Sequence, residues 1–161
     1  MVKDDHRSEP VIVHAPHAPK PAAVRFYFDA DVLGLAKVVA RLRADVTYPG
    51  DSGAFVHKRR RPACPITDTA TDDVDWIPEV ASRGWLIITR DSRIQDHPAE
   101  IEAVRSAGAR MVALAGKEAI GVWNQLEVLM SQWRGIERLL EQPAPFIYRA
   151  TRTGLRAIPL S

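Results

Sequence analysis

The chain has 161 residues and a mass of 17.9 kDa, with 46% apolar residues, which suits one domain with a single core and leaves too little chain for two. No apolar run approaches the ~18 residues of a membrane span, and one cysteine, Cys64, excludes an intrachain disulfide, a thiolate zinc cage and an iron–sulfur cluster. The formal charge of +2 hides segregation: "HKRRRP" holds four consecutive bases, whereas "DTATDDVDWIPE" holds five acids and no base. The first residues lack the basic and apolar regions of a signal peptide, so we expect a reduced, cytoplasmic setting.

The sequence predicts one domain over residues 24–161, preceded by a flexible extension rich in proline and histidine over residues 1–23. His14 and His17 in this extension have the spacing of some metal pairs, but a solvated loop is the simpler interpretation. Apolar spacing and turn residues predict alternating strands and helices after it. In chain order these are a strand at 24–28, a helix at 32–44, a short strand at 45–51, a polar loop at about 50–70, a helix at 73–84, a strand at 85–89, a helix at 98–108, a strand at 110–114, a helix at 118–141 and one or two strands at 145–160.

Strands separated by helical crossovers predict an α/β fold with a mainly parallel central sheet flanked by helices. Pro78 favours a late start, near Trp76, for the helix that contains it. The last long helix carries a broad apolar stripe that includes Trp123 and Trp133. Core packing is the default interpretation of such a stripe, and a dimer or partner surface is the alternative.

Aspartates follow the two most apolar predicted strands. Asp29 and Asp91 each lie one or two positions beyond a strand, and in parallel α/β sheets such residues meet at the carboxyl edge, where ligands bind. Asp31, Asp73 and Asp75 come from adjoining segments. Carboxylates without a counter-base raise one another's pKa unless a cation is bound, and Mg²⁺ or Mn²⁺ prefers such oxygen ligands. The sequence therefore predicts a site for metal-assisted phosphodiester hydrolysis, with these five carboxylates as candidate metal ligands.

The basic run indicates that the substrate is a nucleic acid, because its positive charges could hold a phosphate backbone that an acidic cleft would otherwise repel. Two further arginines flank the third acid and could also contact phosphate. The candidate nucleic-acid-binding residues are Lys58, Arg59, Arg60, Arg61, Arg90 and Arg93.

Simpler explanations exist for each feature. Asp29 or Asp31 can be read as a helix cap, Asp91 as a turn residue, and Asp73 and Asp75 as acids that suit a helix dipole. The basic run can equally be read as a solvated loop. Two other functions stay open: a non-catalytic nucleic-acid or protein-binding module, and a haloacid-dehalogenase-like phosphatase with Asp29 as nucleophile, although the Gly-Thr usual after the second aspartate is missing.

The residues resemble those of the PIN-like nucleases, and among them the short toxin components of toxin–antitoxin pairs. The resemblance rests on "FYFDADV", "DVDWIPEVASRGWLIITRDSRI", "HPAEIEAVRSAGA" and "PFIYRATRTG", which together cover most of residues 24–158. The segment over residues 73–94 is the most specific part.

The resemblance implies a Rossmann-like PIN domain, a Mg²⁺- or Mn²⁺-dependent endoribonuclease acting on RNA in the cytoplasm, and inhibition by a cognate antitoxin protein. Asp31 and Asp75 match additional ligands or water-positioning bases. The acid that full-length members carry on an early helix has no equivalent, since Asp51 lies in the predicted loop. The catalytic acids implied by the resemblance are Asp29, Asp73 and Asp91.

Overall fold

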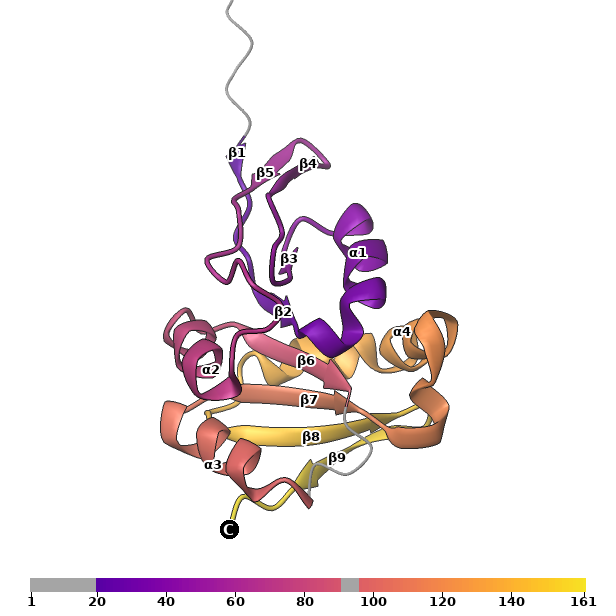
Figure 1. The fold of residues 1–161 in the computed structure, drawn as a ribbon. Coiled ribbons are helices and arrows are strands. Elements are labelled where there is room, and N and C mark those ends of the chain that lie inside the picture. The colour runs from indigo at the N-terminus through magenta and orange to yellow at the C-terminus, as the bar shows by residue number, and fades with distance from the viewer. Residues whose placement is uncertain (1–19, 91–95) are drawn as a thin grey trace, which may run out of the picture.

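The computed structural model describes residues 20–90 and 96–161, which form two sheets and four α-helices (Figure 1). The helices are α1 (Leu33–Leu42), α2 (Asp73–Ser82), α3 (Pro98–Ala107) and α4 (Gly121–Leu139). The larger sheet contains β2 (Phe26–Phe28), β3 (Val46–Thr47), β6 (Leu86–Arg90), β7 (Arg110–Leu114), β8 (Phe146–Thr151) and β9 (Gly154–Ile158). The smaller sheet contains β1 (Lys20–Pro21), β4 (Ala54–Val56) and β5 (Arg59–Arg61).

The larger sheet has the strand order β3-β2-β6-β7-β8-β9, and its neighbours are parallel except for β8 and β9. This confirms the α/β fold with a mainly parallel, Rossmann-like sheet. The chain runs from β2 outward to β3 and then returns to the other side of β2 as β6, so the strand order reverses between β2 and β6. In open α/β sheets the crevice beyond the carboxyl ends of such a strand pair is the usual ligand site.

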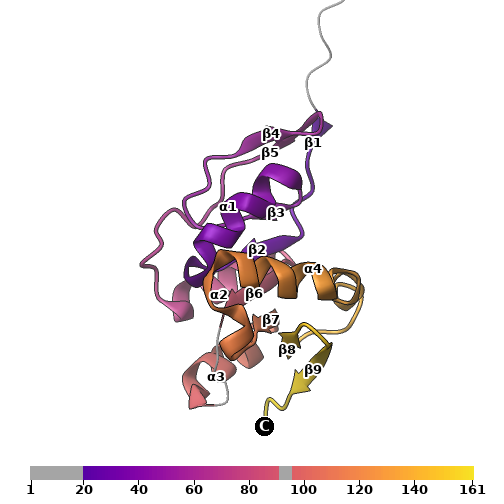
Figure 2. The ribbon, with the colours of Figure 1, turned by 90° about the vertical axis from the view of Figure 1, so that its right-hand side faces the viewer.

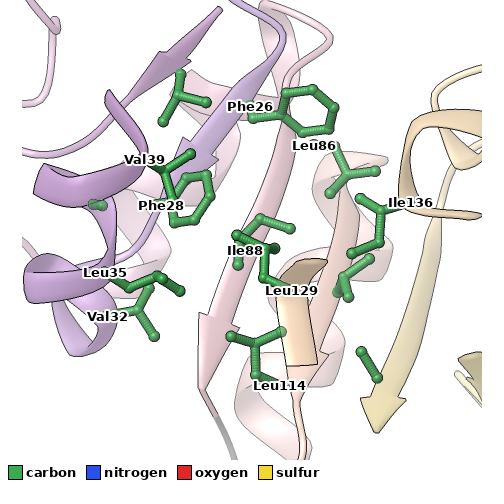
Figure 3. Close-up of a cluster of buried hydrophobic side chains, with 14 of the residues drawn as sticks. Phe26, Phe28, Val32, Leu35, Val39, Leu86, Ile88, Leu114, Leu129 and Ile136 are labelled. Carbon is green, nitrogen blue, oxygen red and sulfur yellow. The ribbon is translucent and has the colours of Figure 1, made fainter. Parts of the chain in front are cut away.

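Helices cover both faces of this sheet: α1 and α4 lie on one face, and α2 and α3 lie on the other (Figures 1 and 2). Successive residues of β2 point to opposite faces. Phe26 and Phe28 enter the core beneath α1 and α4, where Phe26 lies near Leu86 and Phe28 near Ile88 (Figure 3). Tyr27 enters the second core and packs on Trp76 with ring centroids 5.1 Å apart. Burial on both faces explains why this strand is a continuous apolar run.

The apolar stripe of α4 divides between core and solvent. Leu129 and Ile136 are buried, and Trp133 packs on Phe26 with ring centroids 4.7 Å apart. Trp123, by contrast, is 79% exposed. Core packing therefore accounts for the later turns of the helix but not for its exposed tryptophan.

Two helices begin or end at or near the proline and glycine residues that the sequence predicts. Gly84, two residues after α2, and Gly108, directly after α3, have positive φ values of 72° and 64°, and Pro98 opens α3. The late start predicted for α2 is wrong, because this helix begins at Asp73 and contains Pro78. Pro78 has no N–H, so the helix lacks one hydrogen bond, the one to the carbonyl of Val74. Val74 is exposed in the first turn, where water can replace the missing donor.

The long polar loop predicted at about 50–70 is also wrong in part, because it contains the hairpin of β4 and β5. The hairpin turns at His57 and Lys58, which both have positive φ values, 48° and 63°. Four consecutive basic residues do not alternate with apolar ones, so the period-two signal of a strand is absent from the sequence. A contact made only in the folded chain, between Arg61 of β5 and Asp51, holds the hairpin in place.

The predicted extension reaches the domain at its last residues, since Lys20–Pro21 pairs in parallel with β5. His14 and His17 lie outside the described residues. None of the helices in the described chain is long and apolar enough to cross a membrane.

Candidate active site at the carboxyl edge of the sheet

Asp29 follows β2 directly and lies at the switch point. Its backbone N–H donates to the carbonyl of Ile88 in β6 at 2.9 Å, which continues the pairing of the two strands by one residue. Its carboxylate Oδ1 accepts a hydrogen bond from the N–H of Ala30 at 2.6 Å and so caps the short 3₁₀ turn Ala30–Val32. The capping and functional interpretations of Asp29 are therefore compatible: the cap holds the carboxylate at the sheet edge.

Thr89 in β6 links the two aspartates that follow β2. Its hydroxyl lies 2.9 Å from Oδ2 of Asp31 and 3.3 Å from Oδ2 of Asp29, and the side chain is only 1% exposed. Asp31 also accepts a hydrogen bond from the N–H of Arg90 at 3.1 Å. One hydroxyl proton serves one acceptor at a time, so Thr89 orients the pair as a unit.

Sequence reasoning missed Thr89 as a site residue. The available signal was its position: it is the one polar residue in the apolar run "WLIIT", at the strand end that faces the predicted site. A buried hydroxyl at such a place requires a hydrogen-bond partner, and the aspartates supply it.

Asp73 lies in the first turn of α2 and is oriented by its own helix. The indole Nε1–H of Trp76 donates to Oδ1 of Asp73 at 2.9 Å, which is the contact that a spacing of three residues on a helix allows. Trp76 is buried against Tyr27, so the core fixes the indole and the indole fixes the carboxylate. A negative side chain in the first turn also interacts favourably with the helix dipole.

The charges of this edge influence one another. Burial raises the pKa of Asp29 above its ordinary value, and the negative charge of Asp73 raises it further, while hydrogen bonds from Ala30 and Thr89 oppose the shift. Burial also raises the pKa of the Tyr27 hydroxyl, with Asp29 and Asp73 adding to the shift. Asp29 has no basic partner among the described residues, so its ionised form is stabilised only by these hydrogen bonds.

The remaining predicted acids fall into two groups. Asp75 lies exposed in the first turn of α2, beside Asp73 in sequence. Asp91 lies outside the described residues, as does Arg93, a predicted phosphate contact. Within residues 20–90 and 96–161, no three acidic, histidine or cysteine side chains are close enough together to hold one metal ion.

Asp51 and Arg61 form a buried ion pair, and this pair corrects the prediction that Arg61 contacts nucleic acid. Each is 3% exposed, and Arg61 Nε lies 2.7 Å from Oδ2 of Asp51. Thr47 and the N–H of Gly53 donate to the same carboxylate, and Arg61 Nη1 donates to the carbonyl of Ala40 at 3.1 Å. Both carboxylate oxygens of Asp51 are occupied, and the guanidinium of Arg61 is turned away from solvent, so Arg61 is wrong as a nucleic-acid contact.

The other described members of the predicted nucleic-acid surface are exposed: Lys58, Arg59, Arg60 and Arg90.

A family model described as "PIN like domain" matches residues 24–116, the segment that contains Asp29, Asp73, Thr89 and the whole hairpin. No curated protein and no solved structure matches the chain.

Proposed function

Because the chain belongs to the PIN-like domain family, whose fold is of the nuclease type, we propose that it is a divalent-metal-dependent endoribonuclease and the toxin of a toxin–antitoxin pair. One observation carries the catalytic part of the proposal. Asp29 is half-buried at the switch point, and this desolvation, together with the negative charge of Asp73, raises its pKa. Such perturbed carboxylates at a sheet edge are typical of functional sites.

The donor chemistry of this edge suits Mg²⁺ or Mn²⁺. Carboxylate oxygens are the ligands that these hard ions prefer, and a cation would relieve the repulsion between Asp29 and Asp73. We propose that these two residues and Asp91 hold one or two ions, with Asp31 and Asp75 as additional ligands. When bound, such an ion supplies Lewis acidity toward a phosphate oxygen and lowers the pKa of water.

The chain's own residues would position these groups. Thr89 holds the carboxylates of Asp29 and Asp31 in one orientation, and Trp76 does the same for Asp73. Carboxylates held in this way need no reorganisation when charge develops on the substrate. We propose that four exposed bases, Lys58, Arg59, Arg60 and Arg90, and with them Arg93, which lies outside the described residues, hold the phosphates of an RNA on either side of the cleaved bond.

The toxin assignment adds a protein partner, a cognate antitoxin, and a cytoplasmic place of action. The exposed apolar side chains on α4 support a protein contact, with Trp123 79% exposed and Met130 69% exposed. We propose this helix as the surface for the antitoxin or for a second copy of the chain.

The experiment is cleavage of a labelled RNA by the full chain with Mn²⁺, with EDTA, and after Asp29→Asn, Asp73→Asn or Thr89→Val. We expect EDTA to abolish cleavage, each aspartate variant to lower kcat/KM at least about 100-fold, and Thr89→Val to lower it about 10- to 100-fold, as a residue that orients a ligand does. Glu141→Gln, an exposed acid away from the sheet edge, is the control and should cleave normally. Absence of cleavage by the unaltered chain, or cleavage indifferent to EDTA and Asp29→Asn, would refute the proposal.

A further inference from the structure

The smaller sheet has one face whose side chains have no partner in the described structure. Across its three strands, Pro21 of β1 lies opposite Arg60 of β5, and Arg60 lies opposite Phe55 of β4. Residues that oppose one another across strands point to the same face, so these three side chains form a row. All three are exposed, Phe55 by 63%, whereas the alternate residues Val56 and Arg61 are buried on the other face.

A hollow of about 430 Å³ borders this row and is lined by Phe55, Arg60 and Pro62 among others. The smaller sheet projects from the larger one, above β2 and β3, in both views (Figures 1 and 2). The row is therefore separate from the carboxylates at the end of β2. It offers an aromatic ring, a planar guanidinium and a proline ring side by side, next to an open space.

The charge around the row favours a polyanion. No acid occurs between Asp51 and Asp68, and Asp51 is already paired with Arg61. Lys58, Arg59 and Arg60 are exposed and have no acidic partner among the described residues. Exposed positive charges without counter-ions are the electrostatic footprint of nucleic-acid binding.

The backbone holds this surface in shape before any ligand binds. The turn at His57 and Lys58 adopts positive φ at two residues that are not glycine, a conformation with an energetic cost. The ring Nε2–H of His57 donates to the carbonyl of Leu42 at the end of α1 at 3.0 Å, and the buried pair of Arg61 and Asp51 anchors the returning strand. A rigid platform loses little conformational entropy on binding.

We propose that this face binds unpaired bases of single-stranded RNA: Phe55 and Arg60 stack on bases, and Lys58, in the hairpin turn between them, contacts phosphates. Aromatic rings and guanidinium planes stack on any base, but only where the base is not already stacked within a duplex. The choice of RNA rests on the proposed function, and the platform adds to it a preference for single-stranded substrate.

The test measures binding of a fluorescent 12-nucleotide single-stranded RNA, a 12-base-pair RNA duplex and an abasic 12-mer to the full chain. The chain carries Asp29→Asn and the buffer contains EDTA, so that no cleavage occurs. We expect tighter binding of the single strand than of the duplex, and Phe55→Ala or Arg60→Gln to weaken single-strand binding about 5- to 150-fold. Phe55→Trp should preserve it. Phe55→Ala should leave the abasic probe unaffected, because that probe has nothing to stack.

The matched control is Arg156→Gln, which changes an exposed arginine on another strand, β9, and should leave binding of the single strand unchanged. Equal binding of duplex and single strand, no effect of Phe55→Ala, or an equal effect on the abasic probe would each overturn the platform. Cleavage by the unaltered chain with Phe55-independent binding would reject the platform and leave the nuclease proposal standing. Phe55-dependent binding without any cleavage would reject the nuclease and support the platform.

Discussion

At the scale of single residues, the same chemistry has opposite consequences in Asp29 and Asp51. Asp51 is buried and Asp29 is half-buried, but Asp51 has a guanidinium at 2.7 Å, whereas Asp29 has only hydrogen-bond donors and a neighbouring negative charge. A paired buried charge serves the fold, whereas an unpaired one costs stability and persists where a function requires it. This contrast supports Asp29, rather than Asp51, as a residue of the proposed site.

Asp29→Asn should raise the melting temperature at pH 7 in EDTA by a few degrees. Because the pKa of Asp29 is raised in the folded chain, the folded state binds more protons than the unfolded state between the ordinary value of 3.8 and the raised value. Stability therefore falls as pH rises through this window, and the loss is complete above it. The Oδ1 of asparagine can still accept from the N–H of Ala30, and its Nδ2 can donate to the Thr89 hydroxyl, which itself donates to Asp31, so the site stays hydrogen-bonded without the charge. A thermal unfolding series over pH checks this, with Glu141→Gln as control; equal melting temperatures at pH 7 would contradict it.

Arg61→Met should destabilise the fold by roughly 3–5 kcal/mol, because it leaves the carboxylate of Asp51 buried without its partner. The double variant with Asp51→Asn should recover part of this loss, since it removes the unpaired charge. Arg60→Gln, one residue away but exposed, should change stability by less than about 0.5 kcal/mol. Denaturant unfolding measures all three. Similar effects of Arg61→Met and Arg60→Gln would show that the buried pair does not stabilise the hairpin.

At the scale of elements, the hairpin of β4 and β5 depends on a close approach of two backbone segments. Gly53 opens the hairpin with a φ of 88°, and a Cβ at this position would lie 2.5 Å from the carbonyl oxygen of Arg61. Only glycine avoids both the strained conformation and the clash. The hairpin thus rests on this glycine at its base and on the ion pair of Arg61 within β5.

Gly53→Ala should therefore destabilise the chain more than Gly84→Ala. Both glycines have positive φ, but a Cβ at Gly84 would meet nothing within 4 Å. Gly84→Ala should therefore lower the free energy of unfolding only by the cost of a positive φ, about 1–2 kcal/mol. The additional loss of unfolding free energy in Gly53→Ala measures the cost of the clash. Denaturant unfolding of the two variants compares them directly, and equal losses would argue against the tight approach.

At the scale of the whole molecule, the sheet brings together carboxylates that the sequence separates. Parallel pairing of β2 with β6 places Asp29 beside Thr89, and the crossover through α2 places Asp73 near the same edge. The acids lie on different elements, so a cation that joins them would stabilise the folded chain as a unit. Because a cation that binds only the folded chain shifts the folding equilibrium, this stabilisation can be measured as a rise in melting temperature.

Mg²⁺ should raise the melting temperature of the unaltered chain by several degrees, because a ligand at a hundred times its Kd adds about 2.7 kcal/mol to the stability of a folded protein. Asp29→Asn should lose most of this response while starting from a higher melting temperature in EDTA. Differential scanning fluorimetry over a Mg²⁺ titration checks both expectations. An unchanged Mg²⁺ response in the variant would place the cation elsewhere.

The sequence by itself determined the alternation of strands and helices and the candidate acids at their ends. Continuous apolar runs such as residues 85–89 and helix-ending glycines such as Gly84 and Gly108 are local signals, and local signals can be read in sequence. These runs also carried the family resemblance. Asp29 and Asp73 were identified in this way because each occupies a marked position next to a strand or in a helix's first turn.

Only the tertiary structure decided which charges face solvent and which are paired. Arg61 and Arg60 are adjacent in a uniform basic run, yet one is buried against Asp51 and the other is exposed opposite Phe55. Thr89 became a site residue only when β6 was paired with β2, and the strand nature of residues 54–61 depended on contacts with distant chain. The physical reason is the same in each case: pairing and burial are set by partners far away in sequence, which no local pattern contains.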